Sequence, residues 1–351
     1  MARHLFKFMY DIAFINIVTH SDSIHVYVEL LRSKKQKRSD ERIFILNESY
    51  KPELLFDYIK PFMEDTPYFY ISLLDTSFEQ GALPTCNKHE LSKYKDLSTS
   101  KYRCIDQKWI CYTSAADLEK QIKEHSAYGV DFVFSPFVIL KKFFKDKIQE
   151  RIALYVFIQQ DALAVAVFQE GKLLYGDYLD TRADMTLGDE IELGFESNEQ
   201  KETEDESIDL DEIDLDEDLS LDEELEELDD FSELESLDEL NGEDDLESRL
   251  DANLESVDKN EEEEEEDLEK AQQATEDFKR FTLIQSSLAR YYRDERYESD
   301  FIENAYIADS VKVGNDFKRY MQEELFLTPY IRSIEPEYEI AQLAKEELGL
   351  L

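Results

Sequence analysis

Histidines are the first residues to consider, because imidazole is the commonest protein ligand for transition metals. The chain has five of them, His4, His20, His25, His89 and His125. Two histidines that share a metal on one helix need a spacing such as His-x-x-x-His, and no pair here has that spacing. The sequence therefore predicts no zinc-type metal site.

A second candidate is a calcium loop. Asp214, Asp216 and Asp218 have the spacing of its first three ligands. However, Leu219 stands where the sharp turn needs glycine, and Leu225 stands where a bidentate glutamate belongs. We expect no more than loose association with divalent cations at these carboxylates.

Nucleophile and phosphate motifs are equally weak. Ser98 and Lys101 form a Ser-x-x-Lys pattern, which is short enough to arise by chance, and no companion motif of the serine acyl-enzymes accompanies it. We interpret it as a polar loop. The 351 residues include only nine glycines and no glycine-rich loop of Walker or Rossmann type.

One polar group remains, formed by His20, Asp22 and His25. It has two interpretations. The three side chains could form a small substitute binding site, or they could be the polar tip of a hairpin plus one outward-facing strand residue. We favour the hairpin tip, since a fold-level argument alone does not establish a site.

The elements around this group form a β-meander. Phe14–Val18 is an apolar run, and Ile24–Leu30 alternates apolar and polar residues with the period of a strand. The polar residues Thr19–Ser23 join them. Lys34–Arg38 is predicted to be an exposed turn that leads into a third strand at Ile43–Leu46.

The same pattern occurs again 140 residues later. Leu154–Ile158 and Leu163–Phe168 are apolar runs joined by the turn Gln159–Ala162, and Glu170-Gly171 turns into a third run at Leu173–Leu179. A duplicated meander followed by helices predicts two similar α/β lobes rather than one large sheet. Further strands are expected at Tyr68–Leu74, Phe132–Ser135 and Asn304–Ile307, and helices at Asp117–His125, Val138–Gln149, Phe281–Tyr291, Asp316–Leu325 and from Glu339 onward.

An acidic tract interrupts this pattern. Residues 201–270 hold 37 acidic and 4 basic side chains, so they carry −33 of the net charge of −45 and leave −12 for the rest of the chain. Leucine and phenylalanine recur every three residues between Leu225 and Leu240, so on a helix they would spiral around the axis and form no stable face. High charge with dispersed apolar residues predicts disorder.

Several classes of protein are excluded by composition. A chain this acidic lacks the basic face that nucleic acids require. The N-terminal run has no signal-peptide pattern, and no stretch is long and apolar enough to cross a membrane. Cys86, Cys104 and Cys111 include no Cys-x-x-Cys pair and cannot all be disulfide-bonded, so we expect a reducing cytoplasm.

The duplicated meander resembles the actin-like ATPase fold and, within it, PilM and the cytoplasmic domain of GspL. The stretches that carry the resemblance are Ile24–Leu31, Ser77–Gly81 with Pro84-Thr85, Leu154–Asp177, Gln285–Arg293 (Gln-x-Ser-Leu-x-x-Tyr-Tyr) and residues 304–325. The resemblance covers most of residues 10–190 and 275–350. It implies an α/β protein with duplicated ribonuclease-H-like lobes and a long acidic insertion.

In that family three loops hold ATP, two of them Asp-x-Gly-type turns at the hairpin tips and the third a Gly-Gly loop at the adenosine. The resemblance places Asn16 to Val18 at the first loop and Phe157 to Gln159 at the second, both without an acid or a glycine. Asp309 and Ser310 replace the Gly-Gly pair, Gly314 is the nearby glycine, and His25 falls near the place of a phosphate-binding lysine. Phosphates bind poorly without backbone donors or a cation. We therefore expect a degenerate member of the family with no catalytic residues, no metal and no ATP or Mg²⁺ cofactor.

The family also implies a partner. PilM-like proteins bind a short cytoplasmic N-terminal peptide of PilN in a groove of the first lobe, and with PilN and PilO they form an assembly that crosses the inner membrane. Such assemblies serve type IV pili, GspL serves type II secretion, and PilM-like proteins also join flagellar motors as accessory cage components. The resemblance implies a cytoplasmic protein, peripheral to the inner membrane, with a bitopic PilN-like partner. It leaves open which machine is served, which residues line the groove, and whether the chain forms a homo-oligomer or ring.

The resemblance also suggests a division of the chain. It places the first lobe at residues 1–150, the start of the second lobe at 151–195, the acidic insertion at 196–270, and the remainder of the second lobe with C-terminal helices at 271–351. The acidic insertion is interpreted as a solvated spacer or as an arm that docks on basic surfaces. The basic turn Lys34, Lys35, Lys37 and Arg38 is interpreted as an ordinary solvated turn or as a contact for anionic lipids, each cation then contributing about 1 kcal/mol.

Three functions follow as hypotheses. The leading one is a non-catalytic, PilM-like scaffold. The alternatives are an actin-like ATPase with a nucleotide-driven assembly cycle, which measurable binding of Mg-ATP would favour, and an acidic decoy or chaperone-like protein, which would lose its function if residues 201–270 were deleted.

Overall fold

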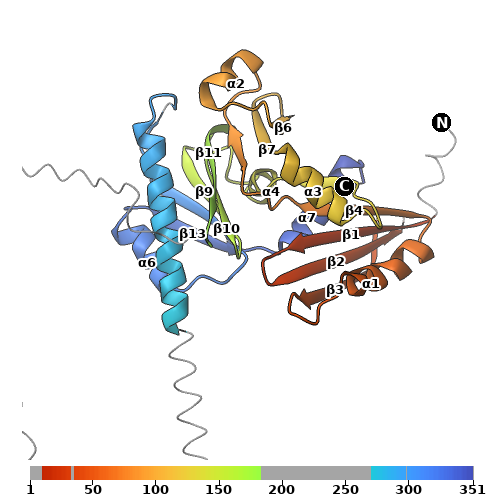
Figure 1. The fold of residues 1–351 in the computed structure, drawn as a ribbon. Coiled ribbons are helices and arrows are strands. Elements are labelled where there is room, and N and C mark those ends of the chain that lie inside the picture. Colours follow the sequence, from red (N-terminus) through yellow and green to blue (C-terminus); the bar gives the residue numbers. More distant parts are fainter. Residues whose placement is uncertain (1–9, 33–34, 183–269, 298, 351) are drawn as a thin grey trace, which may run out of the picture. The chain divides into compact units, whose positions relative to one another are not determined.

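The computed structural model describes residues 10–32, 35–182, 270–297 and 299–350 (Figure 1). The predicted insertion at 196–270 lies outside the described residues apart from its last residue. The calcium-like aspartates and Lys34 also lie outside them.

The first sheet contains the N-terminal meander. Its strands are β1 (Asp11–Thr19), β2 (Ser23–Arg32), β3 (Lys35–Ile45), β4 (Tyr68–Leu74) and β8 (Phe132–Phe134). β1, β2 and β3 are antiparallel, whereas β4 is parallel to β1 and β8 is parallel to β4. The spatial order is β3-β2-β1-β4-β8.

The second sheet repeats this topology. Its strands are β9 (Ala153–Ile158), β10 (Ala162–Gln169), β11 (Lys172–Asp180), β12 (Asn304–Asp309) and β13 (Thr328–Ser333). β9, β10 and β11 form the antiparallel meander, and β12 and β13 continue the sheet in parallel, in the order β11-β10-β9-β12-β13. An antiparallel meander extended by two parallel strands, present twice, confirms the expected pair of ribonuclease-H-like lobes and the actin-like fold.

The central strand of each sheet is apolar on both faces, as a strand between two layers must be. In β1, Phe14 and Val18 belong to one apolar core, while Ile15 and Ile17 point to another. In β9, Phe157 faces the first of these cores, which therefore joins both sheets. The other face of β9 belongs to a third core.

Helices cover the two sheets. Their bounds are α1 (Pro52–Asp65), α4 (Pro136–Phe143), α6 (Asn315–Glu323) and α7 (Pro336–Glu347). A further helix, drawn unlabelled in cyan to blue in Figure 1, spans the described residues 270–293. Its residues Phe281, Ile284, Leu288 and Tyr291 are all buried, which confirms the helical spacing predicted for them. α7 crosses back to the first sheet, where Ile340 and Leu343 join the shared core.

A small third sheet is inserted between β4 and β8, and the sequence analysis did not predict it. It contains β5 (Gln80–Leu83), β7 (Trp109–Ser114) and β6 (Ser100–Ile105), in that order, with α2 (Lys88–Tyr94) before β6 and α3 (Ala115–Glu124) after β7. Trp109 is fully buried against Phe168 of β10. A Cβ on Gly176 of β11 would lie 2.9 Å from the carbonyl oxygen of Ala82, so glycine permits β5 to approach the second sheet.

Two cysteines of this insert are paired. Cys86 and Cys104 form a disulfide, and Cys111 is free. The spacing of the cysteines did not indicate this pairing, because disulfide connectivity depends on which chain segments the fold brings together.

Two predicted boundaries were wrong. β3 begins at Lys35, so the basic residues Lys35, Lys37 and Arg38 lie in a strand and not in a turn. The reason is that β3 pairs with β2 along nearly its whole length as a solvent-exposed edge strand, where polar side chains are tolerated. α4 ends at Phe143 instead of Gln149, and the chain continues in consecutive hydrogen-bonded turns. These turns bury Phe144 and Ile148 four residues apart, so the sequence has helical spacing although the helix has ended.

Candidate functional site

The resemblance to the actin-like ATPase fold places two of the nucleotide loops at the tips of the two hairpins. Asn16 and Val18, the predicted first-loop residues, lie inside β1 and are buried. The Asn16 amide donates to the carbonyl oxygen of Tyr27 at 3.0 Å and so stabilises the hairpin. The tip itself consists of residues 20–22.

The two tips are bonded to each other. The backbone N–H of Ser21 donates to Asp161 Oδ2 at 2.7 Å, and the Ser21 hydroxyl donates to Asp161 Oδ1 at 2.6 Å. We call this pair of hydrogen bonds the tip latch. A carboxylate thus occupies a backbone donor of the kind that a phosphate would use.

The polar group His20, Asp22 and His25 lies beside the latch. The rings of His20 and His25 meet edge to face at 4.9 Å, and His25 Nδ1 is 3.9 Å from Glu337 Oε1 of α7. Burial lowers the pKa of His20, and the charge of His25 lowers it further. Asp22 does not join the histidines in a metal site, since the described part of the chain contains no cluster of three potential metal ligands.

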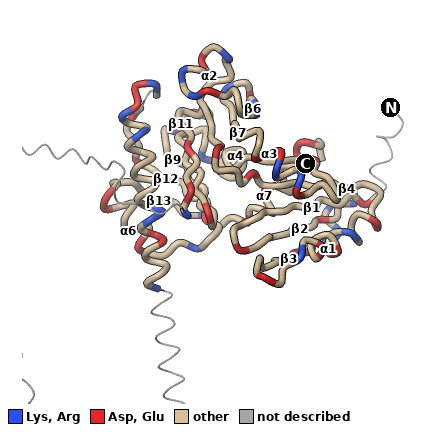
Figure 2. Tube along the Cα trace, in the orientation of Figure 1, with Lys and Arg blue, Asp and Glu red and all other residues tan. Residues whose placement is uncertain are grey.

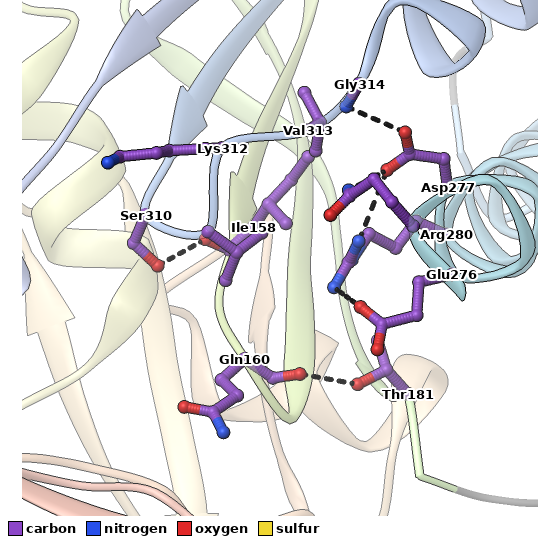
Figure 3. Close-up of polar contacts among 12 residues, drawn as sticks. Ile158, Gln160, Thr181, Glu276, Asp277, Arg280, Ser310, Lys312, Val313 and Gly314 are labelled. Atoms are coloured by element: carbon purple, nitrogen blue, oxygen red, sulfur yellow. Dashed lines mark hydrogen bonds and ion pairs between the residues drawn. The ribbon is translucent and has the colours of Figure 1, made fainter. Parts of the chain in front are cut away.

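The second hairpin has no open phosphate loop either. Phe157 is fully buried within β9, and Gln159 is buried and donates to the Tyr178 hydroxyl at 3.4 Å. The hydroxyl of Thr181 donates to the carbonyl oxygen of Gln160 at 3.2 Å (Figure 3). This turn is therefore held by contacts within the second sheet.

The loop after β12 is closed on itself by Asp309. Its buried carboxylate accepts three backbone N–H groups, from Val311 at 3.0 Å, Lys312 at 2.9 Å and Val313 at 2.9 Å. Ser310 donates its hydroxyl to the carbonyl oxygen of Ile158 at 2.8 Å, which fastens the loop to β9 (Figure 3). These donors are no longer free to bind an adenosine or a phosphate.

Gly314 is used in a similar way. Its N–H donates to Asp277 Oδ2 at 2.7 Å, and Asp277 also accepts from Arg280 at 3.3 Å (Figure 3). Arg280 in turn donates to Glu276 at 2.6 Å. The predicted third-loop residues Asp309, Ser310 and Gly314 are thus brought together, and their polar groups are satisfied by the protein.

A small cavity remains between the tips. Its volume is about 180 Å³, and His20, Ser21, Asp161 and Arg182 contribute to its lining. Ligand sites for drug-sized molecules usually measure about 300–1,000 Å³. The cavity between the tips is smaller than this range.

A larger cavity lies in the first lobe, between the small third sheet, α4 and the end of α7. Its volume is about 560 Å³. Apolar residues such as Val133, Phe134, Val138 and Leu343 line it together with several lysines. This volume and mixed lining suit an extended peptide segment.

Sequence reasoning missed Asp161 and the role of Asp309. A signal for Asp309 existed, because an aspartate directly after an apolar strand often accepts hydrogen bonds from the following backbone. Asp161 had no comparable signal, since its partner Ser21 is 140 residues away. The residues that line the larger cavity come from six elements, β6, β7, α3, β8, α4 and α7, so their proximity was not visible in the sequence.

The predicted basic turn is largely neutralised. Lys37 pairs with Asp11 at 2.9 Å, and Arg38 pairs with Asp40 at 2.7 Å. Lys35 is exposed on the edge strand. Among the residues that Figure 1 draws in colour, no helix has the length and apolar character needed to cross a membrane.

Two family models match the sequence. One, described as domain of unknown function DUF8341, matches residues 154–349, and another, described as domain of unknown function DUF8569, matches residues 10–141. No curated protein matches the chain.

Solved structures show only distant similarity. A Bacteroides thetaiotaomicron protein with actin-like ATPase fold and unknown function is 13% identical with a TM-score of 0.35, over 51% of this chain and 73% of the other. A PilM-PilN type IV pilus biogenesis complex is 9% identical with a TM-score of 0.35, over 48% of this chain and 61% of the other, which is less than two thirds of its length. An Aquifex aeolicus member of the Ppx/GppA family is 11% identical with a TM-score of 0.25, over 48% of this chain and 51% of the other. Values this low carry no functional argument.

Proposed function

We propose that this chain, which belongs to the family described as domain of unknown function DUF8341, is a non-catalytic scaffold that docks the cytoplasmic peptide of a bitopic, PilN-like inner-membrane protein. It would act at the cytoplasmic face of the membrane as part of an envelope-spanning machine. A flagellar-motor cage, a type IV pilus and a type II secretion system are the machines that fit the sequence resemblance to PilM and GspL.

The observation that carries the proposal concerns the loops where the family holds ATP. Their backbone N–H groups donate hydrogen bonds to carboxylates of the protein itself. Asp309 accepts three backbone N–H groups, Asp277 accepts that of Gly314, and Asp161 accepts that of Ser21. Phosphate binding would have to break these hydrogen bonds and place negative charge beside the same carboxylates, which is unfavourable. This supports a protein that works without ATP or Mg²⁺.

The cavity of the first lobe supports the docking role. Its apolar lining residues and its position beside the third sheet make it the candidate for the peptide groove, whose residues the sequence left open. Because the partner would carry the membrane anchor, the scaffold itself needs no membrane span and no free basic turn.

Binding of nucleotide is the direct test of the non-catalytic part. We expect isothermal titration of the intact protein with Mg-ATP to give no saturable heat, and the protein to release no phosphate. A saturable isotherm with micromolar affinity would contradict this part and favour the actin-like ATPase.

Capture from native cells tests the docking part. We expect crosslinking followed by purification of the intact protein to recover a bitopic inner-membrane protein together with pilus, secretion or motor components. The variant Tyr102→Ser, at an exposed residue of the groove, should reduce this recovery, whereas Tyr330→Ser, at a similarly exposed strand residue outside the groove, should not. Recovery of soluble proteins alone would contradict the docking role.

A further inference from the structure

The first-lobe cavity has an unusual electrostatic character for this chain. Five basic residues line it, Lys101, Arg103, Lys141, Lys142 and Lys145. The chain as a whole carries −45, and even without residues 201–270 its balance is −12. Figure 2 shows basic and acidic positions mixed along the described elements. The cavity lining also holds four acidic residues, Asp75, Asp106, Glu346 and Glu347, so its five basic residues leave it with a formal balance of +1.

Carboxylates of the same protein already occupy part of this basic lining. Lys142 pairs with Glu346 Oε1 at 2.7 Å, and Arg103 donates to both carboxylate oxygens of Glu347 at 3.0 and 3.2 Å. Lys141 pairs with Asp106. Burial lowers the pKa of Lys142, and the contact with Glu346 opposes that shift.

The position of Glu346 and Glu347 is itself informative. They are the last two residues of α7, where the partial negative charge of the helix C-terminus disfavours acidic side chains. The basic lining of the cavity explains why two carboxylates are nevertheless stable there. It also shows that carboxylates are the groups this lining accepts.

Two cations remain available. Lys101 of β6 and Lys145 after α4 are exposed, and neither forms an ion pair with a carboxylate of the described residues. Apolar residues such as Val138 and Leu343 belong to the same lining. The cavity therefore combines two exposed, unpaired cations with apolar side chains.

We infer that this cavity selects an acidic, apolar segment, whose carboxylates bind Lys101 and Lys145 and displace Glu346 and Glu347 from the basic lining. The inference rests on the proposed function, because the same cavity receives the partner peptide there. It specifies the chemistry of that peptide. It also assigns the end of α7 the role of an internal competitor that must leave when the partner binds.

The test uses the intact protein and two fluorescein-labelled synthetic peptides. One alternates leucine with glutamate, and the other alternates leucine with lysine. We expect fluorescence anisotropy to report saturable binding of the glutamate peptide alone, weakened as salt concentration rises because the contacts are partly exposed.

Charge variants locate the site. Lys101→Glu combined with Lys145→Glu should weaken binding about tenfold, and Glu346→Gln combined with Glu347→Gln should strengthen it about threefold, the order of effect of partly exposed ion pairs. Lys60→Glu is the matched control, because Lys60 pairs with Glu64 on α1, away from the cavity, and should leave binding unchanged.

The outcomes separate this inference from the proposed function. Preference for the lysine peptide, or equal loss of binding in the Lys60→Glu control, would overturn the acidic preference while docking of a membrane partner in native cells still stood. If Glu346→Gln with Glu347→Gln weakened binding, the role of α7 as a competitor would be wrong. Failure to capture any membrane partner from native cells would contradict the proposed function, whichever peptide binds.

Discussion

Three aspartates in this protein accept hydrogen bonds from backbone N–H groups of its loops. Asp309 and Asp277 bind the N–H groups of the loop after β12, and Asp161 binds Ser21 of the opposite tip. Asp309 and Asp161 are short polar side chains at turns, where such side chains compete well for backbone groups, whereas Asp277 lies on the helix of residues 270–293. Two predictions belong to this scale.

The first concerns Gly314. A Cβ at this position would lie 2.7 Å from Asp277 Oδ2, so Gly314→Ala must push away the carboxylate that binds its own N–H. We expect a loss of about 1–3 kcal/mol in the free energy of unfolding, measured by urea denaturation.

The double variant Gly314→Ala with Asp277→Ala tests whether the Asp277 carboxylate causes this loss of stability. If the carboxylate is the obstacle, Gly314→Ala should cost much less in the Asp277→Ala background than in the wild type. An equal cost in both backgrounds would show that the clash is not with Asp277.

The second concerns His20 and pH. Its pKa lies below the ordinary value of 6.5, chiefly through burial, and the charged groups that face it are His25, Asp161 and Asp22. As pH falls through 6.5, the unfolded chain takes up the proton before the folded protein does, so stability declines until the folded pKa is passed.

We therefore expect the stability of the wild type relative to His20→Gln to fall between about pH 7 and pH 5 and to be constant above that range. Denaturation at a series of pH values measures the difference. A relative stability that rises on acidification would mean that the nearby aspartates outweigh burial.

At the scale of secondary structure, the third sheet is the feature that the sequence did not predict. The third sheet is short and half exposed, and its strand β6 has exposed, polar-rich sequence without strict alternation. Its order depends on contacts with β11 and β10 and on the disulfide between Cys86 and Cys104. Two predictions belong here.

Reduction of the disulfide should loosen the insert. The bond closes a loop between residues 18 apart, so its loss should cost about 3 kcal/mol by the chain-entropy model. We expect Cys86→Ser with Cys104→Ser, or a reducing agent, to lower the melting temperature, while Cys111→Ser, at the free cysteine, leaves the response to reductant intact.

The same pair also tests the compartment. The structure pairs the two cysteines in a disulfide, whereas in the reducing cytoplasm expected from the sequence they would be thiols. Alkylation of free thiols in intact native cells, followed by mass spectrometry, should then label both. Complete protection of Cys86 and Cys104 would contradict the cytoplasmic placement in the proposed function.

At the scale of the whole molecule, the described lobes share one apolar core and are tied by polar contacts between distant segments. The tip latch is one of these contacts, and Arg332 of β13 forms another with Asp146 at 3.0 Å. The most buried is the ion pair between Glu29 of β2 and Lys345 of α7, at 2.9 Å. Such contacts hold the described lobes together.

The buried pair gives the prediction at this scale. Glu29→Gln would leave the Lys345 charge buried without its counter-ion, so we expect a loss of about 3–5 kcal/mol in the free energy of unfolding. Replacing both residues with methionine should recover most of that loss, because no buried charge remains. If Glu29→Gln costs less than about 1 kcal/mol, as exposed pairs do, α7 is not anchored by this pair.

The sequence by itself determined the features that arise from local pattern. The two meanders follow from runs such as Leu154–Ile158 and Leu163–Phe168, whose apolar residues and polar turn specify a hairpin without reference to distant residues. The spacing of Phe281, Ile284, Leu288 and Tyr291 specified a helix for the same reason. The repetition of the meander indicated the duplicated fold.

Only the tertiary structure decided the contacts between segments far apart in the chain. Asp161 meets Ser21, Lys345 meets Glu29, and Glu347 meets Arg103 because two sheets and a returning helix bring them together. Each of these side chains has an ordinary local environment in the sequence, and its role depends on burial and on a partner that the local pattern does not specify. The hydrogen bonds between the hairpin tips and the cavity lined by basic residues are therefore properties of the packed molecule.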